Sequence, residues 1–257
     1  MSWIKFLGTA GARFVVMKQL RASGGLWVNI DETNILVDPG PGCLVKCNSS
    51  KPRLDPMDLD AIILTHRHLD HSNDVNIMVE AMTNGGFKRK GELYAPRDAL
   101  EGNDPVVLKY VRNMVSNVKV LHEKENYHVR NVVFETPVKH VHGVETYGLN
   151  FKNKTGENIL SLISDTRYFN GLERFYTGDI VIINVVRFKP MKNLDHLCFA
   201  DAERIIRKNK PRQTVLTHFG MTMLREKPWE LAKSLSKKLG VKVVAASDGM
   251  TIDLENI

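Results

Sequence analysis

Three histidines and one aspartate lie within six residues of one another in the segment THRHLDH at positions 65–71. This segment directly follows the apolar run 61–64, whose branched side chains predict a buried strand that ends in a loop. Imidazoles and carboxylates this close together are costly to bury unless a cation compensates them. The chain has nine histidines in all, so a chance cluster in a solvated loop is the weaker interpretation. The segment therefore predicts a metal site with His66, His68, Asp70 and His71 as ligands.

The H-x-H-x-D-H spacing of this segment resembles the second motif of the metallo-β-lactamase superfamily. Other segments resemble the remaining motifs in the same order, so the resemblance covers the chain from about Ile4 to Leu254. It implies two divalent cations, and zinc suits neutral imidazole and carboxylate ligands, with Mn²⁺ and Fe²⁺ as alternatives. The implied ligands are His66, His68 and His142 for one cation, Asp70, His71 and His218 for the other, and Asp165 between them.

The segment that resembles the third motif offers two histidines, His140 and His142. In an extended chain both side chains point to the same face, so the residues alone do not decide which one binds metal. Members of the ribonuclease Z and small-phosphodiesterase kind place the ligand six residues before a glycine in the next strand. Because Gly148 stands six residues after His142, the resemblance favours His142. His140 is then expected to support a ligand or to face the substrate.

Three further motif residues stand at the ends of predicted strands. Asp38 resembles the first motif, in which an aspartate orients the ligand loop from behind, although a turn-capping role before Pro39 is an equal alternative. Asp165 resembles the fourth motif, and its two carboxylate oxygens can serve one cation each. His218 resembles the histidine of the fifth motif.

His196 is the candidate general acid. It lies 22 residues before His218, and tRNA-processing members of the superfamily carry a non-ligand histidine at a similar offset. There the residue contacts the scissile phosphate or protonates the leaving oxygen. A structural hydrogen bond is the alternative, although the neighbouring Asp195 favours a functional role because it can orient the ring. Asp70 and His196 are the expected catalytic residues, with a dinuclear-metal-activated hydroxide as the nucleophile.

The composition is that of an ordinary globular protein, with 43% hydrophobic and 25% charged residues among 257. We expect one domain over residues 1–257, since no linker or internal repeat interrupts the chain. No apolar run approaches the ~18 residues of a membrane span, and no signal-peptide pattern is seen, so no membrane partner is expected. Three cysteines at no zinc-finger spacing fit a reducing compartment, and a cytoplasmic location is expected. The net charge of +7 favours an anionic small-molecule or nucleotide substrate, leaves nucleic acid open as a partner, and is compatible with a homodimer.

The fold class implied by the resemblance is α/β, as an αββα sandwich with two mixed sheets facing each other, helices outside and the metals at one edge. The order of the expected elements fits this architecture. Expected strands cover 3–7, 26–30, 34–38, 61–64, 93–95, 118–121, 127–129, 132–134, 151–163 as a hairpin, 180–186, 214–217, 241–245 and 250–254. Expected helices cover 73–82, 105–115, 200–208 and 228–239.

The favoured function is hydrolysis of phosphodiester bonds. Ribonuclease Z members carry a long tRNA-binding arm between the third and fourth motifs, but only 22 residues lie between His142 and Asp165. A small or single-stranded nucleotide-like substrate is therefore expected. Hydrolysis of a carboxylic ester, thioester or lactone is the alternative, although those members usually have glycine soon after the second motif, where this chain has 72–74 as Ser-Asn-Asp. A non-hydrolytic di-iron or binding protein is less favoured, because di-iron members replace the histidine at position 68 with Glu.

Overall fold

The computed structural model describes residues 2–255, and half of its strands form one mixed sheet near the amino terminus. These strands are β1 (Trp3–Phe6), β2 (Leu26–Ile30), β3 (Thr33–Val37), β4 (Ala61–Ile63), β5 (Glu92–Ala95), β6 (Asn117–Val120) and β14 (Thr251–Asp253). Their order in the sheet is β14-β1-β2-β3-β4-β5-β6. Pairing is antiparallel from β14 to β3 and parallel from β3 to β6.

The second sheet repeats this division between antiparallel and parallel strands. Its strands are β7 (Glu125–Val129), β8 (Val132–Thr136), β9 (Leu149–Lys152), β10 (Asn158–Ile163), β11 (Ile180–Asn184), β12 (Gln213–Thr217) and β13 (Lys242–Ala245). Their order is β13-β12-β11-β10-β9-β8-β7. Pairing is parallel from β13 to β10 and antiparallel from β10 to β7.

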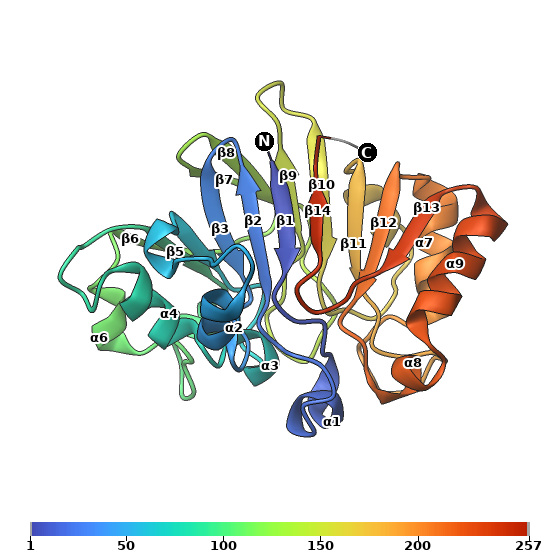
Figure 1. Cartoon of the computed structure of the whole chain (residues 1–257), viewed down its shortest axis with the longest axis horizontal. Helices are drawn as coiled ribbons and strands as arrows, with labels where there is room; N and C mark the ends of the chain where they lie inside the picture. Colours follow the sequence, from blue (N-terminus) through green and yellow to red (C-terminus); the bar gives the residue numbers. More distant parts are fainter. Residues whose placement is uncertain (1, 256–257) are drawn as a thin grey trace.

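Helices cover the outer faces of both sheets, and the short helices α1 and α3 lie at the lower ends of the strands (Figure 1). They are α1 (Ala12–Met17), α2 (Cys43–Ser49), α3 (Leu69–Ser72), α4 (Val75–Met82), α5 (Arg97–Leu100), α6 (Lys109–Arg112), α7 (Phe199–Asn209), α8 (Met221–Arg225) and α9 (Pro228–Leu239). Two 3₁₀ turns, η1 (Pro56–Asp58) and η2 (Leu172–Phe175), accompany them. No helix within residues 2–255 combines the length and the hydropathy needed to cross a bilayer.

Alternating side chains along the strands produce three apolar layers. In β3, Ile35 and Val37 point into the core between the sheets, whereas Leu36 points outward and packs with α4. In β11, Ile180 and Ile182 likewise face the space between the sheets. The intervening residues of β11 face the layer beneath α7 and α9. The predicted αββα sandwich is therefore confirmed, because both faces of each sheet are covered.

Several local predictions were wrong. The helix expected over 105–115 is a single turn at Lys109–Arg112, and part of the loop predicted after 61–64 is helical at Leu69–Ser72. The short helices α1, α2 and α8 were not predicted. Helices of four to seven residues are marginal in isolation and carry too few turns for a periodic pattern, so tertiary packing decides where they form.

Candidate metal centre

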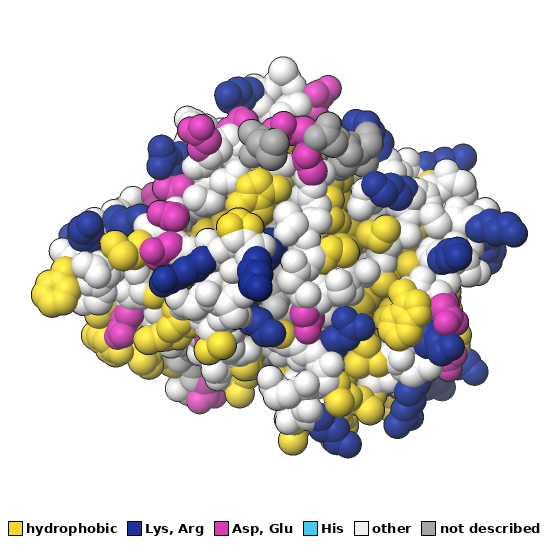
Figure 2. Space-filling model, viewed as in Figure 1, with side chains coloured by type: hydrophobic (Ala, Val, Ile, Leu, Met, Phe, Trp, Pro, Cys, Tyr) yellow, Lys and Arg dark blue, Asp and Glu magenta, His cyan; other side chains and the backbone are white. Residues whose placement is uncertain are grey.

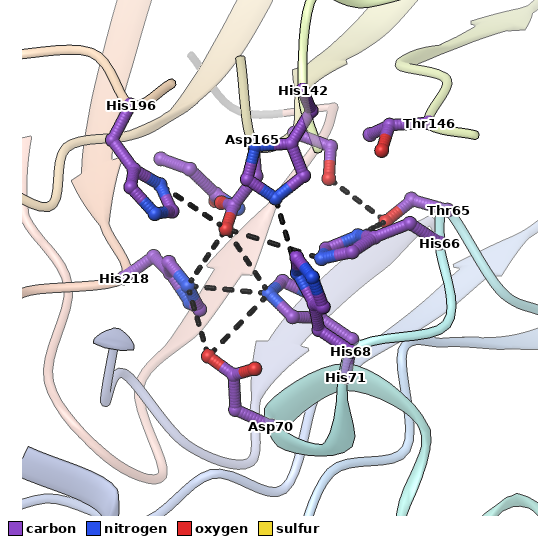
Figure 3. Close-up of polar contacts among 12 residues, drawn as sticks. Thr65, His66, His68, Asp70, His71, His142, Thr146, Asp165, His196 and His218 are labelled. Carbon is purple, nitrogen blue, oxygen red and sulfur yellow. Dashed lines mark hydrogen bonds and ion pairs between the residues drawn. The ribbon is translucent and has the colours of Figure 1, made fainter. Parts of the chain in front are cut away.

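The eight sequence-predicted residues that the structure brings together follow strand ends at one edge of the sandwich (Figure 3). His66 and His68 lie in the loop after β4, and the short helix α3 carries Asp70 and His71. The second sheet supplies the other four: His142 after β8, Asp165 after β10, His196 after β11, and His218 after β12. Carboxyl ends of parallel strands meet at one edge of a sheet, which explains why segments so distant in sequence converge here.

The Oδ2 atom of Asp165 is the centre of the cluster (Figure 3). Its partner oxygen Oδ1 accepts a hydrogen bond of 2.9 Å from Asn184 Nδ2, so the carboxylate is held in one orientation. Four imidazole nitrogens surround Oδ2: His196 Nδ1 at 3.4 Å, His218 Nε2 at 3.5 Å, His71 Nε2 at 3.6 Å and His66 Nε2 at 4.0 Å.

A first group of possible ligand atoms belongs to His66, His68 and His142. His142 Nδ1 lies 2.9 Å from the Asp195 carbonyl oxygen, which only accepts, so Nδ1 carries the proton. The lone pair of His142 Nε2 then faces His68 Nδ1 at 3.1 Å. Two ring nitrogens at this distance need a proton or a cation between them.

The orientation of His66 follows from a network behind it. The Thr65 hydroxyl donates to Asp38 Oδ2 at 2.7 Å, because a carboxylate only accepts. The same hydroxyl oxygen, 3.1 Å from His66 Nδ1, must therefore accept from that nitrogen. His66 Nε2 is left with a lone pair, and this atom is buried with no hydrogen-bond partner. A buried, unpartnered acceptor that points at other ligand-type atoms fits a metal ion.

A second group consists of Asp70, His71 and His218. His71 Nδ1 donates to Asp38 Oδ2 at 2.9 Å, which turns His71 Nε2 toward the cluster. This Nε2 lies 3.2 Å from His218 Nε2, and Asp70 Oδ2 lies 3.9 Å from the former and 3.6 Å from the latter. Asp38 therefore contacts the ligand loop from behind, where the first motif predicts an orienting carboxylate.

Unusual backbone conformations hold two of these residues in place. Asp38 has φ 53° and His218 has φ 59°, both in the left-handed region that non-glycine residues rarely adopt. Two glycines allow close approach of neighbouring chain segments: a Cβ at Gly40 would lie 2.1 Å from the Asp70 carbonyl oxygen, and one at Gly11 would lie 2.1 Å from that of His218. Strain of this kind persists where the surrounding structure imposes it, as at functional sites.

His140 lies beside the cluster, but both of its ring nitrogens are already engaged. Nδ1 donates to the Asp165 carbonyl oxygen at 3.2 Å, and Nε2 accepts from the Tyr176 hydroxyl at 2.6 Å. Burial lowers the pKa of His140 to about 4, so the ring is neutral. His140 therefore fixes the backbone that carries Asp165, whereas His142 points into the cluster.

His196 is mostly buried at the rim of the cluster, with 19% of its side chain exposed. Its Nδ1 faces Asp165 Oδ2 and has no hydrogen bond, and its ring centroid lies 5.0 Å from that of His142. Burial lowers the pKa of His196. Asp195 does not orient this ring through its side chain, as the sequence suggested; its carbonyl oxygen orients His142 instead.

Two histidines of the first group, His66 and His68, are neutral near pH 7. Burial lowers the pKa of His66 well below its ordinary value and lowers the pKa of His68 to about 4. Neutral imidazole is the form that binds a metal, so both rings present usable lone pairs.

The second group has an environment that attracts positive charge. Burial acts to lower the pKa of His71, but the carboxylates of Asp38, Asp70 and Asp165 outweigh it and hold the pKa well above its ordinary value. Burial acts to raise the pKa of Asp165, but the imidazoles of His218 and His71 hold it well below the usual range. A cation bound among these groups would satisfy the carboxylates and the facing nitrogens together, so the donor set fits two metal ions that share Asp165.

Asn184, Thr65 and Ser164 belong to the site, although no role was predicted for them from the sequence. Asn184 ends the apolar strand β11 and holds Asp165, as described above. The Thr65 and Ser164 hydroxyls lie 2.8 Å apart and join the two sheets directly behind the ligands. A polar residue at the carboxyl end of a buried apolar strand is the signal that marks both Asn184 and Ser164.

The chain belongs to the β-lactamase superfamily: the family model described as Beta-lactamase superfamily domain matches residues 33–219, which is more than half of it. An uncharacterized protein of Methanocaldococcus jannaschii is 31% identical over 98% of this chain and 95% of its own length. A ribonuclease Z of Methanopyrus kandleri is 30% identical over 56% of this chain and 47% of its own length. The predicted metallo-β-lactamase relationship is thus confirmed, and members of this superfamily are metal-dependent hydrolases.

Solved structures show the same fold. The metallo-β-lactamase fold protein YhfI from Bacillus subtilis superposes with a TM-score of 0.78 over 98% of both chains, at 19% identity. A diphosphatase from the PhnP family superposes with a TM-score of 0.71 over 98% of both chains, at 21% identity.

Proposed function

We propose that this protein is a dinuclear metal hydrolase that cleaves phosphodiester bonds in small or single-stranded nucleotide-like substrates. The observation that carries the proposal is the arrangement around Asp165 Oδ2, where four histidine nitrogens from three chain segments converge on one carboxylate oxygen. In this arrangement His66, His68 and His142 would hold one cation, Asp70, His71 and His218 would hold the other, and Asp165 would serve both. Zinc suits this ligand set best.

When bound, the two cations lower the pKa of coordinated water toward neutrality and stabilise negative charge on the attacked group. The protein residues position everything else. Asp38 holds the proton on His71 Nδ1 and fixes Thr65, so that the ring nitrogens facing the cluster keep their lone pairs. Asn184 prevents the Asp165 carboxylate from rotating.

His196 is proposed as the residue that donates a proton to the leaving oxygen. Its partly exposed ring lies at the rim, next to His142, and its Nδ1 is directed toward Asp165. Proton donation requires the imidazolium form of His196, which burial disfavours and the negative charge of Asp165 favours. General acids of this kind contribute about 10²- to 10⁴-fold to rate.

A phosphodiester is favoured over other esters by charge and by sequence similarity. The net charge of +7 attracts an anionic substrate. The similarity to a ribonuclease Z extends over more than half of this chain. The segment between His142 and Asp165 contains only the short strands β9 and β10 and a tight turn, which favours a small or single-stranded substrate over a folded tRNA.

The test combines metal analysis with a substrate panel. Protein purified without chelator and loaded with zinc, manganese or iron should hold about two equivalents of one metal. It should hydrolyse bis-p-nitrophenyl phosphate faster than a lactone or a thioester. Preference for the lactone or thioester would replace the phosphodiester assignment with the ester alternative, and a protein that takes up no metal would overturn the proposal.

The role of His196 has its own control. His196→Ala should lower kcat on bis-p-nitrophenyl phosphate by about 10²-fold or more while leaving two metals bound. His128→Ala, which removes an exposed histidine on β7, should change neither quantity. Loss of one metal equivalent in His196→Ala would show instead that this residue is a ligand.

A further inference from the structure

A second cavity lies on the opposite side of the amino-terminal strand from the metal cluster. Phe6, Gly8 and Ala10 line a cavity that also reaches His71 and His218, whereas Lys5 and Leu7 line a separate one of ≈ 230 Å³. Successive side chains of a strand point to opposite faces, so residues of the same segment contribute to two different sites. The second cavity is covered by the end of α2 and the chain that follows it.

Lys5 is the unexpected residue of this cavity. It stands on the outer face of β1, between two apolar residues that pack toward α2, and alternation predicts a third apolar residue at its position. The residue is only 5% exposed. Lysine is almost never buried so deeply without a partner of opposite charge.

The partners of the Lys5 ammonium are all neutral. Nζ donates to the Lys51 carbonyl oxygen at 3.2 Å and to Thr251 Oγ1 at 3.3 Å. An ammonium has three N–H donors, so these contacts leave one N–H without an acceptor. Within residues 2–255, Lys5 forms no ion pair. A buried positive charge without a compensating negative charge is unfavourable.

Two more lysines, Lys46 and Lys51, line the same cavity, and within the described chain neither of them forms an ion pair. The single carboxylate in the lining is Asp248, and three donors already occupy its oxygens. Oδ1 accepts from Thr9 N at 2.9 Å and from Thr9 Oγ1 at 2.7 Å, while Oδ2 accepts from Ala22 N at 2.7 Å. Three lysines and one engaged carboxylate thus line the cavity.

Lysine and arginine side chains lie close together over α2 and beside β1 on the face seen in Figure 2. Ser49 and Ser50 also line the cavity, and their hydroxyls donate to the Lys46 carbonyl oxygen at 3.4 and 2.8 Å. The volume is several times the ~30 Å³ that one water molecule occupies in the liquid, so the space accommodates a tetrahedral oxyanion with accompanying water. Ammonium groups and hydroxyls are the side chains that bind phosphate.

We propose that the cavity lined by Lys5, Lys46 and Lys51 binds a phosphate group, separately from the metal cluster. The bound group supplies the negative charge that Lys5 lacks and accepts its third N–H. Free phosphate and the terminal phosphate of a nucleotide share this chemistry. The site does not depend on the reaction proposed for the metal centre, because the two sites share none of their lining residues.

The experiment titrates inorganic phosphate into the metal-loaded full chain by calorimetry, with a nucleoside 5′-monophosphate in a parallel arm. Lys5→Met places an apolar side chain of similar length in an apolar layer, and Lys46→Met removes a half-buried ammonium from the lining. Each should weaken one phosphate-binding event by about tenfold or more, as expected for loss of a charge-assisted hydrogen bond. Lys88→Met, an exposed lysine far along the chain, is the matched control and should leave binding unchanged.

Binding at the metals is measured separately, as inhibition of ester hydrolysis by phosphate. This inhibition should be the same in Lys5→Met and in the wild type. A protein that hydrolyses no ester would contradict the metal-centre proposal without affecting the phosphate titration of the second cavity. Tighter binding of the nucleotide assigns the cavity to nucleotide phosphates, and binding of inorganic phosphate alone assigns it to free phosphate. If Lys5→Met fails to fold by circular dichroism, Lys46→Met decides the matter. Wild-type phosphate affinity in the folded variants, or no saturable event beyond the metal site, would overturn the proposal.

Discussion

Two buried polar clusters, one around Glu173 and one around Asp165, differ in how well their donors and acceptors are matched. Glu173, in η2, is 3% exposed, and its carboxylate accepts hydrogen bonds from Lys208 Nζ and from the Tyr168 hydroxyl. The Arg204 guanidinium lies over the Tyr168 ring, 4.3 Å from its centroid. Each donor in this cluster meets an acceptor or a ring face, so the cluster is complete without any further group.

The metal cluster is buried to a similar degree, but groups of the same kind face one another in it. His142 Nε2 faces His68 Nδ1 at 3.1 Å, and His71 Nε2 faces His218 Nε2 at 3.2 Å. His66 Nε2 is buried with no partner at all. Buried polar groups in native proteins are nearly always hydrogen-bonded, so the unpartnered His66 Nε2 beside these closely facing ring nitrogens indicates that something else completes the site. Burial of charge alone does not distinguish the two clusters, whereas the match between donors and acceptors does.

Asp165→Asn is expected to have the largest effect on the metal cluster. Asparagine keeps the shape of the side chain and removes the charge that both proposed cations share. We expect kcat on bis-p-nitrophenyl phosphate to fall by about 10³-fold, since the metals are worth several kcal/mol to such reactions. Bound metal, measured by elemental analysis, should fall below two equivalents.

Glu173→Gln is the matched control for this change, because it neutralises a buried carboxylate of the complete cluster. It should retain wild-type activity and two metals. Equal losses of activity in Asp165→Asn and Glu173→Gln would mean that the metal cluster matters no more for activity than the Glu173 cluster.

The residues that converge around Asp165 were predicted from the sequence, and their role as ligands stays a prediction, whereas several of the groups that orient them were not predicted. The segment 65–71 and the strand-end residues Asp165 and His218 carry chemistry in their types and spacing, and the family resemblance places them in order. Asn184 and Ser164 are ordinary polar residues, and only the pairing of β10 with β11 and the contact between the two sheets bring them behind the ligands. Their polar type at the end of an apolar strand is a local signal, but the contacts that they make depend on long-range register, which leaves no local pattern.

In the fold, too, elements with a local sequence pattern were predicted and elements set by long-range packing were not. The long amphipathic helices α7 and α9 and the apolar strands were predictable because burial on one face imposes a period on the residues. Helix α3 was not, although it carries two of the predicted ligands. Its four residues are too few for a period, and its position follows from close packing against Gly40.

A smaller effect is expected for Asp38→Asn. This change alters the hydrogen bonds behind the metal cluster without removing a predicted ligand. Asparagine tolerates the left-handed backbone at this position, but it has one acceptor oxygen for the three donors that Asp38 serves, from Thr65 and His71. Zinc affinity or activity should fall by about 10- to 100-fold, as is typical when a group behind a metal ligand is changed. Competition with a chelator measures the affinity. Unchanged affinity in a folded Asp38→Asn protein would mean that the ligand loop holds its geometry without this carboxylate.

The smallest expected effect is on the stability that the Glu173 cluster provides. Burial acts to raise the pKa of Glu173, but hydrogen bonds from Lys208 and Tyr168 outweigh it and hold the pKa below its ordinary value. A carboxylate with a lowered pKa in the folded state adds stability above its unfolded pKa of about 4.3, and loses it as the pH falls through the folded pKa. Glu173→Gln should therefore reduce the free energy of unfolding by about 1–2 kcal/mol at pH 7.

Urea unfolding of the chelator-treated proteins at a series of pH values measures this difference. The gap between wild type and Glu173→Gln should stay constant from pH 7 to about 5 and narrow below about 4.5. A gap that is the same at pH 7 and at pH 3.5 would assign the loss to packing instead of charge. In that case the ionised Glu173 carboxylate adds nothing to the free energy of unfolding, and packing stabilises its cluster. Only the metal cluster would then depend on its buried charges.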